Sequence, residues 1–207
     1  MIRAAAAGLL ALLWVIAPAQ AQAPAKREAI LLVADSGLLD PNFRETVVLV
    51  TRYRGFAGPL GVVINRPTPV PLSRALPDIP ALATLDDKVY FGGPVARQAL
   101  FYVFRADKAP DDAIEVADGV YLDWGAERLK ELLARDKPME GLRIYAGHAA
   151  WSPGQLEAEV ARGSWRSARP EDRIIFTARP ENLWSELDRR ARATPARYDA
   201  PDPAKPK

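Results

Sequence analysis

The densest group of side chains suited to chemistry lies between Tyr145 and Glu159, where the sequence predicts a strand, a loop and the start of a helix. Ser152, Pro153 and Gln155 predict that start, as an N-cap serine, a proline at the first position and a glutamine at the capping-box position. Free backbone N–H groups at the start of a helix can hold an anion. This stretch therefore predicts a binding site for a small anionic ligand.

The predicted ligand-binding residues of this stretch are His148, Trp151, Gly154 and Gln155. The histidine and the tryptophan would line the mouth of the site, and the glycine would let a ligand approach the backbone closely. A structural interpretation is also open. In it Trp151 and Trp165 are packing anchors, while the serine and the glutamine only cap the helix.

Asn65 and Arg66 form a second candidate site, directly before Pro67. An amide and a guanidinium side by side offer several hydrogen-bond donors to a ligand. Residues of this kind more often close a turn and make a surface ion pair.

Catalytic chemistry, by contrast, finds little support in the sequence. The chain has no cysteine and one histidine, which excludes thiolate sites and a metal site of several histidines within one chain. A hydrolase would need His148 as its base, yet no Gly-x-Ser-x-Gly element supplies a nucleophile. Glu157 and Glu159 are two apart and point to different sides of a helix, so they are poorly placed as an acid–base pair. We predict no catalytic residue, no metal and no cofactor, and a hydrolase centred on His148 is the weakest alternative.

The first 21 residues predict a signal peptide. Arg3 is followed by an apolar run over residues 4–17, and two Ala-x-Ala sites end at Ala21 and Ala23. An uncleaved membrane anchor is the alternative, but the run is shorter than the roughly 20 residues that a membrane span needs. We therefore expect a periplasmic or secreted protein with no membrane span after cleavage.

Charge and length limit the partners. The 207 residues suit one domain. Cleavage after Ala21 would leave 27 basic against 26 acidic residues, and no predicted helix collects Lys and Arg on one face. Binding to nucleic acid draws on several neutralised phosphates, so we expect no specific nucleic-acid partner.

The stretch from Gly58 to Pro67 predicts the central strand. Its β-branched core, Val62, Val63 and Ile64, is uncharged and bounded by glycine and proline, which indicates a strand buried on both faces. Pro67 is expected to end it, because proline cannot donate to a β-ladder. The proline-rich residues 68–80 are predicted to be a loop.

The other predicted elements follow from apolar runs, helical spacing and turn residues. Strands are expected at 29–34, 46–51, 89–91, 100–104, 142–146 and 174–176, and a hairpin at 114–122 around Asp118-Gly119. Helices are expected after Asp123 with Leu129, Leu132 and Leu133 inward, from Ser152 to Gly163, and from Pro180 with Leu183, Trp184 and Leu187 inward.

Four pieces of this sequence, in this order and spacing, resemble the YqgE/AlgH family. They are Asp40-Pro41-Asn42-Phe43 with Thr46-Val47, the stretch 58–67, Val89-Tyr90-Phe91-Gly92-Gly93-Pro94-Val95, and the stretch 145–165. The resemblance implies an α+β fold: one compact domain with a coiled, mixed β-sheet and flanking helices. We place this domain at residues 29–192, between a polar lead at 22–28 and a disordered proline-rich tail at 193–207.

The resemblance implies no established activity, although members of the family are sometimes labelled transcriptional regulators. This sequence departs from the family pattern at Ser36, where proline is frequent, and at 148–151, where an aromatic-Ala-Gly-Trp sequence is usual. Members usually lack a signal peptide. The signal peptide predicted for this chain therefore disfavours a cytoplasmic role here. We therefore expect a non-enzymatic exported binding or structural module that recognises a protein or a small anionic ligand, with a transcriptional regulator as the alternative.

The mature protein is predicted to begin near Gln22, because the charged start, the apolar run and the Ala-x-Ala site stand in the order that signal peptidase recognises. Intact-mass measurement of the exported protein checks the cleavage site. A full-length species held in the membrane would contradict the prediction.

Overall fold

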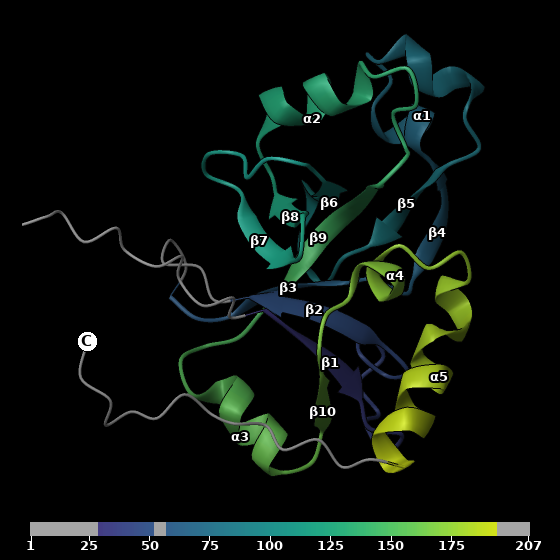
Figure 1. Cartoon of the computed structure of the whole chain (residues 1–207). Helices are drawn as coiled ribbons and strands as arrows, with labels where there is room; N and C mark the ends of the chain where they lie inside the picture. Colours follow the sequence, from purple (N-terminus) through teal and green to yellow (C-terminus); the bar gives the residue numbers. More distant parts are fainter. Residues whose placement is uncertain (1–28, 52–56, 194–207) are drawn as a thin grey trace, which may run out of the picture.

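The computed structural model describes residues 29–51 and 57–193 of the chain (Figure 1). The predicted signal peptide, the polar lead and the tail from residue 194 onward lie outside these ranges. Within them, no helix has both the length and the apolar character that a membrane crossing requires.

A ten-stranded sheet organises the molecule (Figure 1). Eight strands follow the order β10-β1-β2-β3-β9-β6-β8-β7, each antiparallel to its neighbours. Their bounds are β1 Ile30–Ala34, β2 Val47–Thr51, β3 Leu60–Val63, β6 Val95–Arg105, β7 Ile114–Ala117, β8 Val120–Asp123, β9 Leu142–Ala150 and β10 Trp165–Ala168. Strand β5 (Lys88–Phe91) runs parallel to β9, and β4 (Pro67–Pro71) pairs with β5, which makes the sheet mixed.

Helices flank the sheet at both of its ends (Figure 1). They are α1 Leu72–Ala75, α2 Ala126–Leu133, α3 Gln155–Ala161, α4 Asp172–Ile175 and α5 Pro180–Ala193, with one 3₁₀ helix at Pro80–Thr84. The predicted α+β class, a single domain with a coiled mixed sheet and flanking helices, is confirmed.

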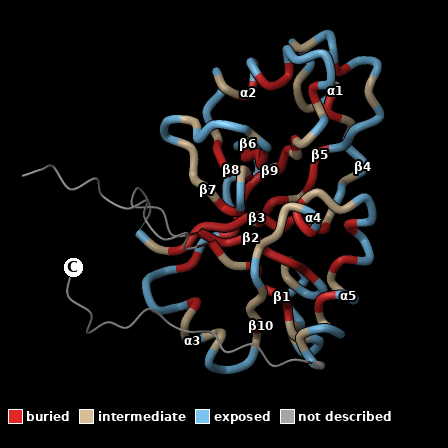
Figure 2. Tube along the Cα trace, viewed as in Figure 1, coloured by how far each residue is buried: buried red, intermediate tan, exposed pale blue. Residues whose placement is uncertain are grey.

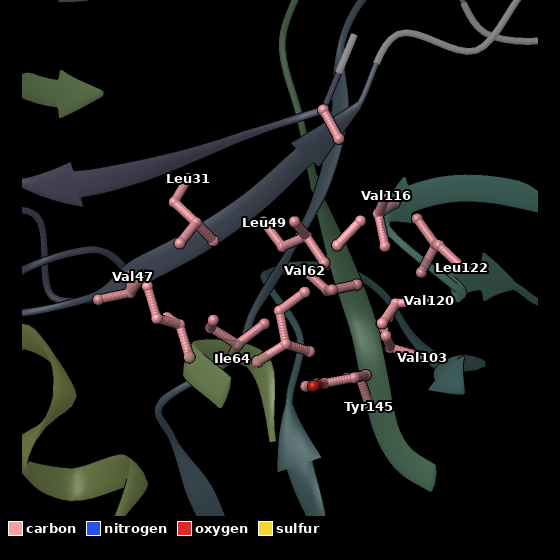
Figure 3. Close-up of a cluster of buried hydrophobic side chains, with 14 of the residues drawn as sticks. Leu31, Val47, Leu49, Val62, Ile64, Val103, Val116, Val120, Leu122 and Tyr145 are labelled. Carbon is pink, nitrogen blue, oxygen red and sulfur yellow. The ribbon is translucent and has the colours of Figure 1, made fainter. Parts of the chain in front are cut away.

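The main core lies inside the curl of the sheet. Leu31, Leu49 and Val62 of β1, β2 and β3 pack in one cluster with Val116 and Leu122 of β7 and β8 (Figure 3). These strands stand far apart in the strand order, so the cluster exists only because the sheet bends back on itself. Burial of these apolar side chains is the main force that holds the curl closed.

Two further clusters cover the outside of the curl, and the helices keep one side exposed to solvent (Figure 2). Leu129, Leu132 and Leu133 anchor α2 over one of them, which confirms the predicted apolar stripe. Trp151 and Trp165 belong to the other, on the side of α3.

Strand β3 is buried on both faces, as predicted. Val62 lies in the cluster inside the curl, while Val63 lies in the cluster beside α3. Neither side chain is exposed to solvent. Gly61 lets β2 come close, because a Cβ there would stand 2.8 Å from the carbonyl oxygen of Leu49.

The prediction that residues 68–80 form a loop after the central strand is wrong in part. Pro67 does not end β3, which stops at Val63, but opens β4, and the following residues form α1 and the 3₁₀ helix. The prolines are tolerated because β4 pairs on one side only, with β5. An edge strand has backbone positions where no N–H is needed.

The predicted last strand, at 174–176, is also wrong. Residues Asp172–Ile175 form the short helix α4, and the strand of this region is β10, beside β1. A short apolar run does not distinguish a strand from a buried helical turn. Strand β10, with the sequence Trp-Arg-Ser-Ala, owes its conformation to pairing with β1 rather than to its own pattern.

The hairpin around Asp118-Gly119 is confirmed, and Gly119 takes a left-handed backbone with φ 65°. Strands β6 and β9 are longer than predicted. The extension of β9 to Ala150 places His148 within a strand rather than in a loop.

Asp123 organises the turn before α2 without capping the helix. Gly125 is the N-cap residue, and the Asp123 carboxylate accepts the N–H groups of Trp124 and Gly125 at 2.6 and 2.9 Å. It also pairs with Arg128. The aspartate therefore fixes the chain just ahead of the helix.

Helix α5 is held by polar contacts as well as by its apolar stripe. The Trp184 indole N–H donates to the Ala34 carbonyl at 2.8 Å. Arg166 of β10 bridges two carboxylates, Asp35 after β1 and Asp188 on α5. These bonds join the helix to the edge of the sheet formed by β1 and β10.

Replacing Val63 by aspartate is expected to prevent folding. An unpaired carboxylate buried on this face costs several kcal/mol, comparable to the whole stability of a domain, roughly 5–15 kcal/mol. Circular dichroism with thermal melting checks this, with Val70→Asp on the exposed face of β4 as the matched control that should fold. A cooperatively melting Val63→Asp protein would show that the burial of β3 is not required.

Candidate functional site

Asn65 joins the end of β3 to the turn that precedes β2. Its side chain is buried, accepts the Val47 N–H at 2.8 Å and donates to the Glu45 carbonyl at 3.0 Å. Glu45 has a left-handed backbone, φ 55°, which is uncommon for a residue other than glycine. The amide of Asn65 therefore holds an otherwise unfavourable turn in place.

The Arg66 side chain binds the same turn through three of its carbonyl groups. Its guanidinium donates to the carbonyls of Pro41 at 3.2 Å and Asn42 at 2.8 Å, and to that of Arg44. Burial lowers the pKa of Arg66, and the positive charge of Arg44 lowers it further. Asn65 and Arg66 both bind backbone groups of the turn at 40–45, and Asn65 also accepts the first N–H group of β2.

Trp151 and Gln155 contact one carboxylate, that of Glu159. The indole N–H groups of Trp151 and Trp165 both donate to its Oε2, each at 2.9 Å, and the Gln155 amide donates to its Oε1 at 2.9 Å. Partial burial alone would raise the pKa of Glu159, but the three hydrogen bonds together bring it below the ordinary value. The carboxylate thus stays ionised and fixes both tryptophans.

The two tryptophans also pack against the turn at 40–45, through Phe43. The Phe43 ring stacks on Trp151 at 6.2 Å between centroids and meets Trp165 edge-on at 5.7 Å. The structure therefore brings the predicted residues Asn65, Arg66 and Trp151 to one turn, from two sides. Gln155 supports this arrangement through the glutamate.

The start of α3 differs from the prediction. Gly154 is the N-cap residue, outside the helix, with a left-handed φ of 78° and no atom within 4 Å of an added Cβ. No side chain caps the helix, so Ser152 is not its N-cap. Instead the Gln155 side chain accepts the Ser152 N–H at 3.1 Å. The left-handed backbone angle explains why glycine occupies position 154, without a role in binding a ligand.

His148 lies apart from the other candidates. It is a buried residue of β9, opposite Val95 of β6. Its ring packs on Phe101 at 4.8 Å, on the side of the main core. Burial lowers the pKa of His148, which favours the neutral imidazole at neutral pH.

One charged group was missed from the sequence. Arg97, in the exposed first half of β6, lies over the Phe91 ring with its guanidinium carbon 5.5 Å from the centroid, and Arg66 approaches the same ring at 6.0 Å. The two arginines are 31 positions apart and follow no shared pattern. Only the pairing of the strands brings them to one aromatic ring.

A cavity of about 550 Å³ was also missed. It lies between the end of β7 and the connection that follows β10, the two strands at the ends of the strand order, and we call it the seam cavity. Its lining residues are Ala29, Val116, Ala117, Asp118, Arg169, Pro170, Glu171 and Asp172. They come from the residue before β1, from the end of β7 and the turn after it, and from the β10–α4 connection with the first residue of α4, so no local sequence signal could have grouped them.

The walls of the seam cavity carry both signs of charge. Asp172 forms a bidentate pair with Arg105 at 2.5 and 2.9 Å, and Glu171 pairs with Arg173 at 2.7 Å. The Arg169 side chain is exposed at the rim. Among the residues described by the structure, no group of three or more histidine, aspartate or glutamate side chains is arranged to hold a metal ion.

Comparison with known proteins places this chain in a family. A family model described as AlgH-like matches residues 31–196. A UPF0301 protein of Streptomyces avermitilis is 41% identical over 172 residues, which cover 78% of this chain and 85% of that protein. A UPF0301 protein of Chlorobaculum tepidum is 34% identical over 157 residues, covering 75% and 81% of the two chains.

Solved structures agree with this assignment. The solution structure of the AlgH protein from Pseudomonas aeruginosa superposes with a TM-score of 0.64 at 26% identity, covering 86% of this chain and 98% of that one. A crystal structure from Corynebacterium diphtheriae gives a TM-score of 0.63 at 26% identity, covering 78% and 85%.

Glu159→Gln is expected to lower the free energy of unfolding by about 1–3 kcal/mol at neutral pH, because the buried indole N–H groups lose a charged acceptor. The pKa of Glu159 is lower in the folded state than the ordinary 4.5. Its contribution is therefore complete above about pH 4.5 and disappears as the pH falls through the folded-state pKa. The stability difference between wild type and variant should narrow over that acidic range.

Denaturant unfolding at several pH values measures this difference. Glu186→Gln on the exposed face of α5 is the matched control, with an expected change within about 0.5 kcal/mol. A pH-independent difference would show that the ionised form of Glu159 is not what holds the tryptophans.

Proposed function

The chain belongs to the AlgH-like family, and within it we propose that this protein is a non-enzymatic binding module that acts outside the cytoplasm. The family is one of uncharacterised proteins, so the proposal depends on this chain's own residues. In it, the seam cavity is the binding site for a small ligand or for a segment of a partner protein.

The size and lining of the seam cavity carry the proposal. About 550 Å³ falls within the range of small-molecule sites, 300–1,000 Å³. Val116, Ala117 and Pro170 supply apolar surface, and Arg169 supplies an exposed cation at the rim. Asp118, Arg169, Glu171 and Asp172 add charged groups to this apolar surface, and such groups can orient a bound ligand.

The placement of the reactive side chains also supports binding over catalysis. Glu159 is engaged by two indoles and an amide, and Arg66 by three carbonyls. His148, the base that a hydrolase would need, packs on Phe101. These contacts give each group a role in the fold.

The compartment and the partners are part of the same proposal. The charged start, the apolar run and the Ala-x-Ala sites support export, and 27 basic against 26 acidic residues after cleavage disfavour a role on nucleic acid. The partner is then a protein or a small anionic ligand of the cell envelope. The regulator alternative instead requires a cytoplasmic protein that binds duplex DNA.

Two variants of the seam cavity test the proposal. Ala117→Leu fills the floor, and Arg169→Glu reverses the charge at the rim. Protein isolated from the envelope fraction is expected to carry a bound molecule that native mass spectrometry detects. Both variants should weaken its affinity at least about tenfold, the effect of losing roughly 1.4 kcal/mol of contact, and should therefore lower its occupancy.

Arg135→Glu, an exposed charge reversal beyond α2, is the matched control and should keep full occupancy. Thermal melting verifies that each variant is folded. Equal occupancy in all variants would reject the seam cavity as the site. Recovery of the protein in the cytoplasm, with sequence-dependent nanomolar binding to duplex DNA, would favour the regulator.

A further inference from the structure

We propose that the free edge of β10 binds an extended segment of a partner protein, which adds to the sheet as one more antiparallel strand. Strand β10 is the last in the strand order, and β1 is its one described neighbour in the sheet (Figure 1). The strand ends at the seam cavity, because Arg169 and Pro170, which line the cavity, directly follow Ala168. This inference rests on the binding function proposed above and names the partner.

The hydrogen bonds to β1 show which backbone groups of β10 point away from the sheet. The Asp35 N–H donates to the Ser164 carbonyl at 2.9 Å. In an antiparallel ladder, hydrogen-bonded pairs alternate with non-bonded pairs. By the register of the two strands, Ala168 is again in a bonded pair with β1, while Trp165 and Ser167 are in non-bonded pairs. The N–H and carbonyl groups of the latter two residues therefore point outward.

The outward groups have no backbone partner in the part of the chain that the structure describes. Within residues 29–51 and 57–193, no backbone group bonds the N–H or the carbonyl of Trp165, Ser167 or Arg169. Trp165 is buried, Ser167 is half-buried and Arg169 is exposed, so the accessible part of this edge runs from Ser167 toward the seam cavity. Strand β10 contains no proline, so each of its residues keeps an N–H donor.

A second extended backbone matches this edge better than a small molecule does. Ser167 and Arg169 are two positions apart, the spacing at which a strand presents successive groups on one side. In strand addition, main-chain hydrogen bonds supply the affinity, and pockets beside the strand select the side chains. A compact small molecule lacks the two-residue repeat, so the edge favours a peptide segment.

The neighbouring side chains indicate which residues the added strand carries. Ala168 packs on the core inside the curl, which also contains Val116 and Ala117 of the cavity lining. The partner residue opposite Ala168 would lie on that same side, and we expect it to be apolar. The residue opposite Arg169 would lie beside an exposed guanidinium, and we expect it to be acidic. An antiparallel segment would therefore read acidic, apolar and then polar opposite Ser167.

The probe is the peptide acetyl-Glu-Val-Thr-Val-Thr-amide, titrated into the ¹⁵N-labelled chain from Gln22 onward, which contains all described residues. The expected result is a saturable shift of the Ser167 and Arg169 amide signals, with a dissociation constant on the order of 1 mM. N-methylation of the central threonine should weaken binding about fivefold or more, because that amide would donate to the Ser167 carbonyl. N-methylation of the preceding valine, whose N–H would point away from β10, should leave the affinity unchanged.

Two variants of the chain test the same contact from the other side. Ser167→Pro removes the outward N–H without removing a hydrogen bond to β1, and it should weaken binding about fivefold or more. Ser167→Ala keeps the backbone groups and is the matched control, which should bind as the wild type does. Thermal melting verifies that both variants are folded, and the methylated peptides give the answer if the proline variant is not.

The absence of a saturable shift, or equal weakening by the two methylated peptides, would overturn the inference. Dimers in analytical ultracentrifugation that Ser167→Pro abolishes would assign the edge to a second copy of this chain and would also overturn it. Loss of the co-isolated molecule in Ala117→Leu without any peptide binding would reject strand addition and leave the seam cavity as a small-ligand site. Peptide binding together with full occupancy in Ala117→Leu would support the edge and reject the cavity.

Discussion

The burial of strand β3 on both of its faces is the constraint on which the rest of the structure depends. Val62 and Val63 point into two different apolar clusters, so the sheet must have one layer inside its curl and another outside it. Strands β7 and β8 close the inner layer, while Trp151, Leu156 and Trp165 cover the outer one. Each layer buries side chains that the other cannot reach.

The polar side chains extend this constraint to the loops. Asn65 and Arg66 follow directly after the buried strand, and both bind the turn at 40–45. The outer layer reaches the same turn through Phe43, which lies against both tryptophans. One short turn is thereby held from the strand and from the helix side, so the motif residues of the family stabilise each other.

Sequence patterns predicted the parts of the fold that local chemistry decides. The β-branched runs gave β1, β2 and β3, Asp118-Gly119 gave a hairpin, and the leucine stripe gave α2. The errors fell where pairing with a distant strand decides the conformation, as in β10, or where an edge tolerates proline, as in β4. The candidate site followed the same division. Asn65, Arg66 and Trp151 converge on the turn at 40–45. The position of Arg97 depends on a bulge and the seam cavity depends on the curl of the sheet, and no local sequence pattern indicates either feature.

The prolines of β4 have a consequence for how this molecule behaves among copies of itself. The free edge of a sheet is a template on which another chain can add a strand, and such addition leads to aggregates. Pro67, Pro69 and Pro71 remove alternate N–H donors from β4. An incoming strand would find no regular ladder of donors there. The same prolines that prevented β4 from being predicted as a strand thus keep this edge of the sheet from pairing with a strand of another chain.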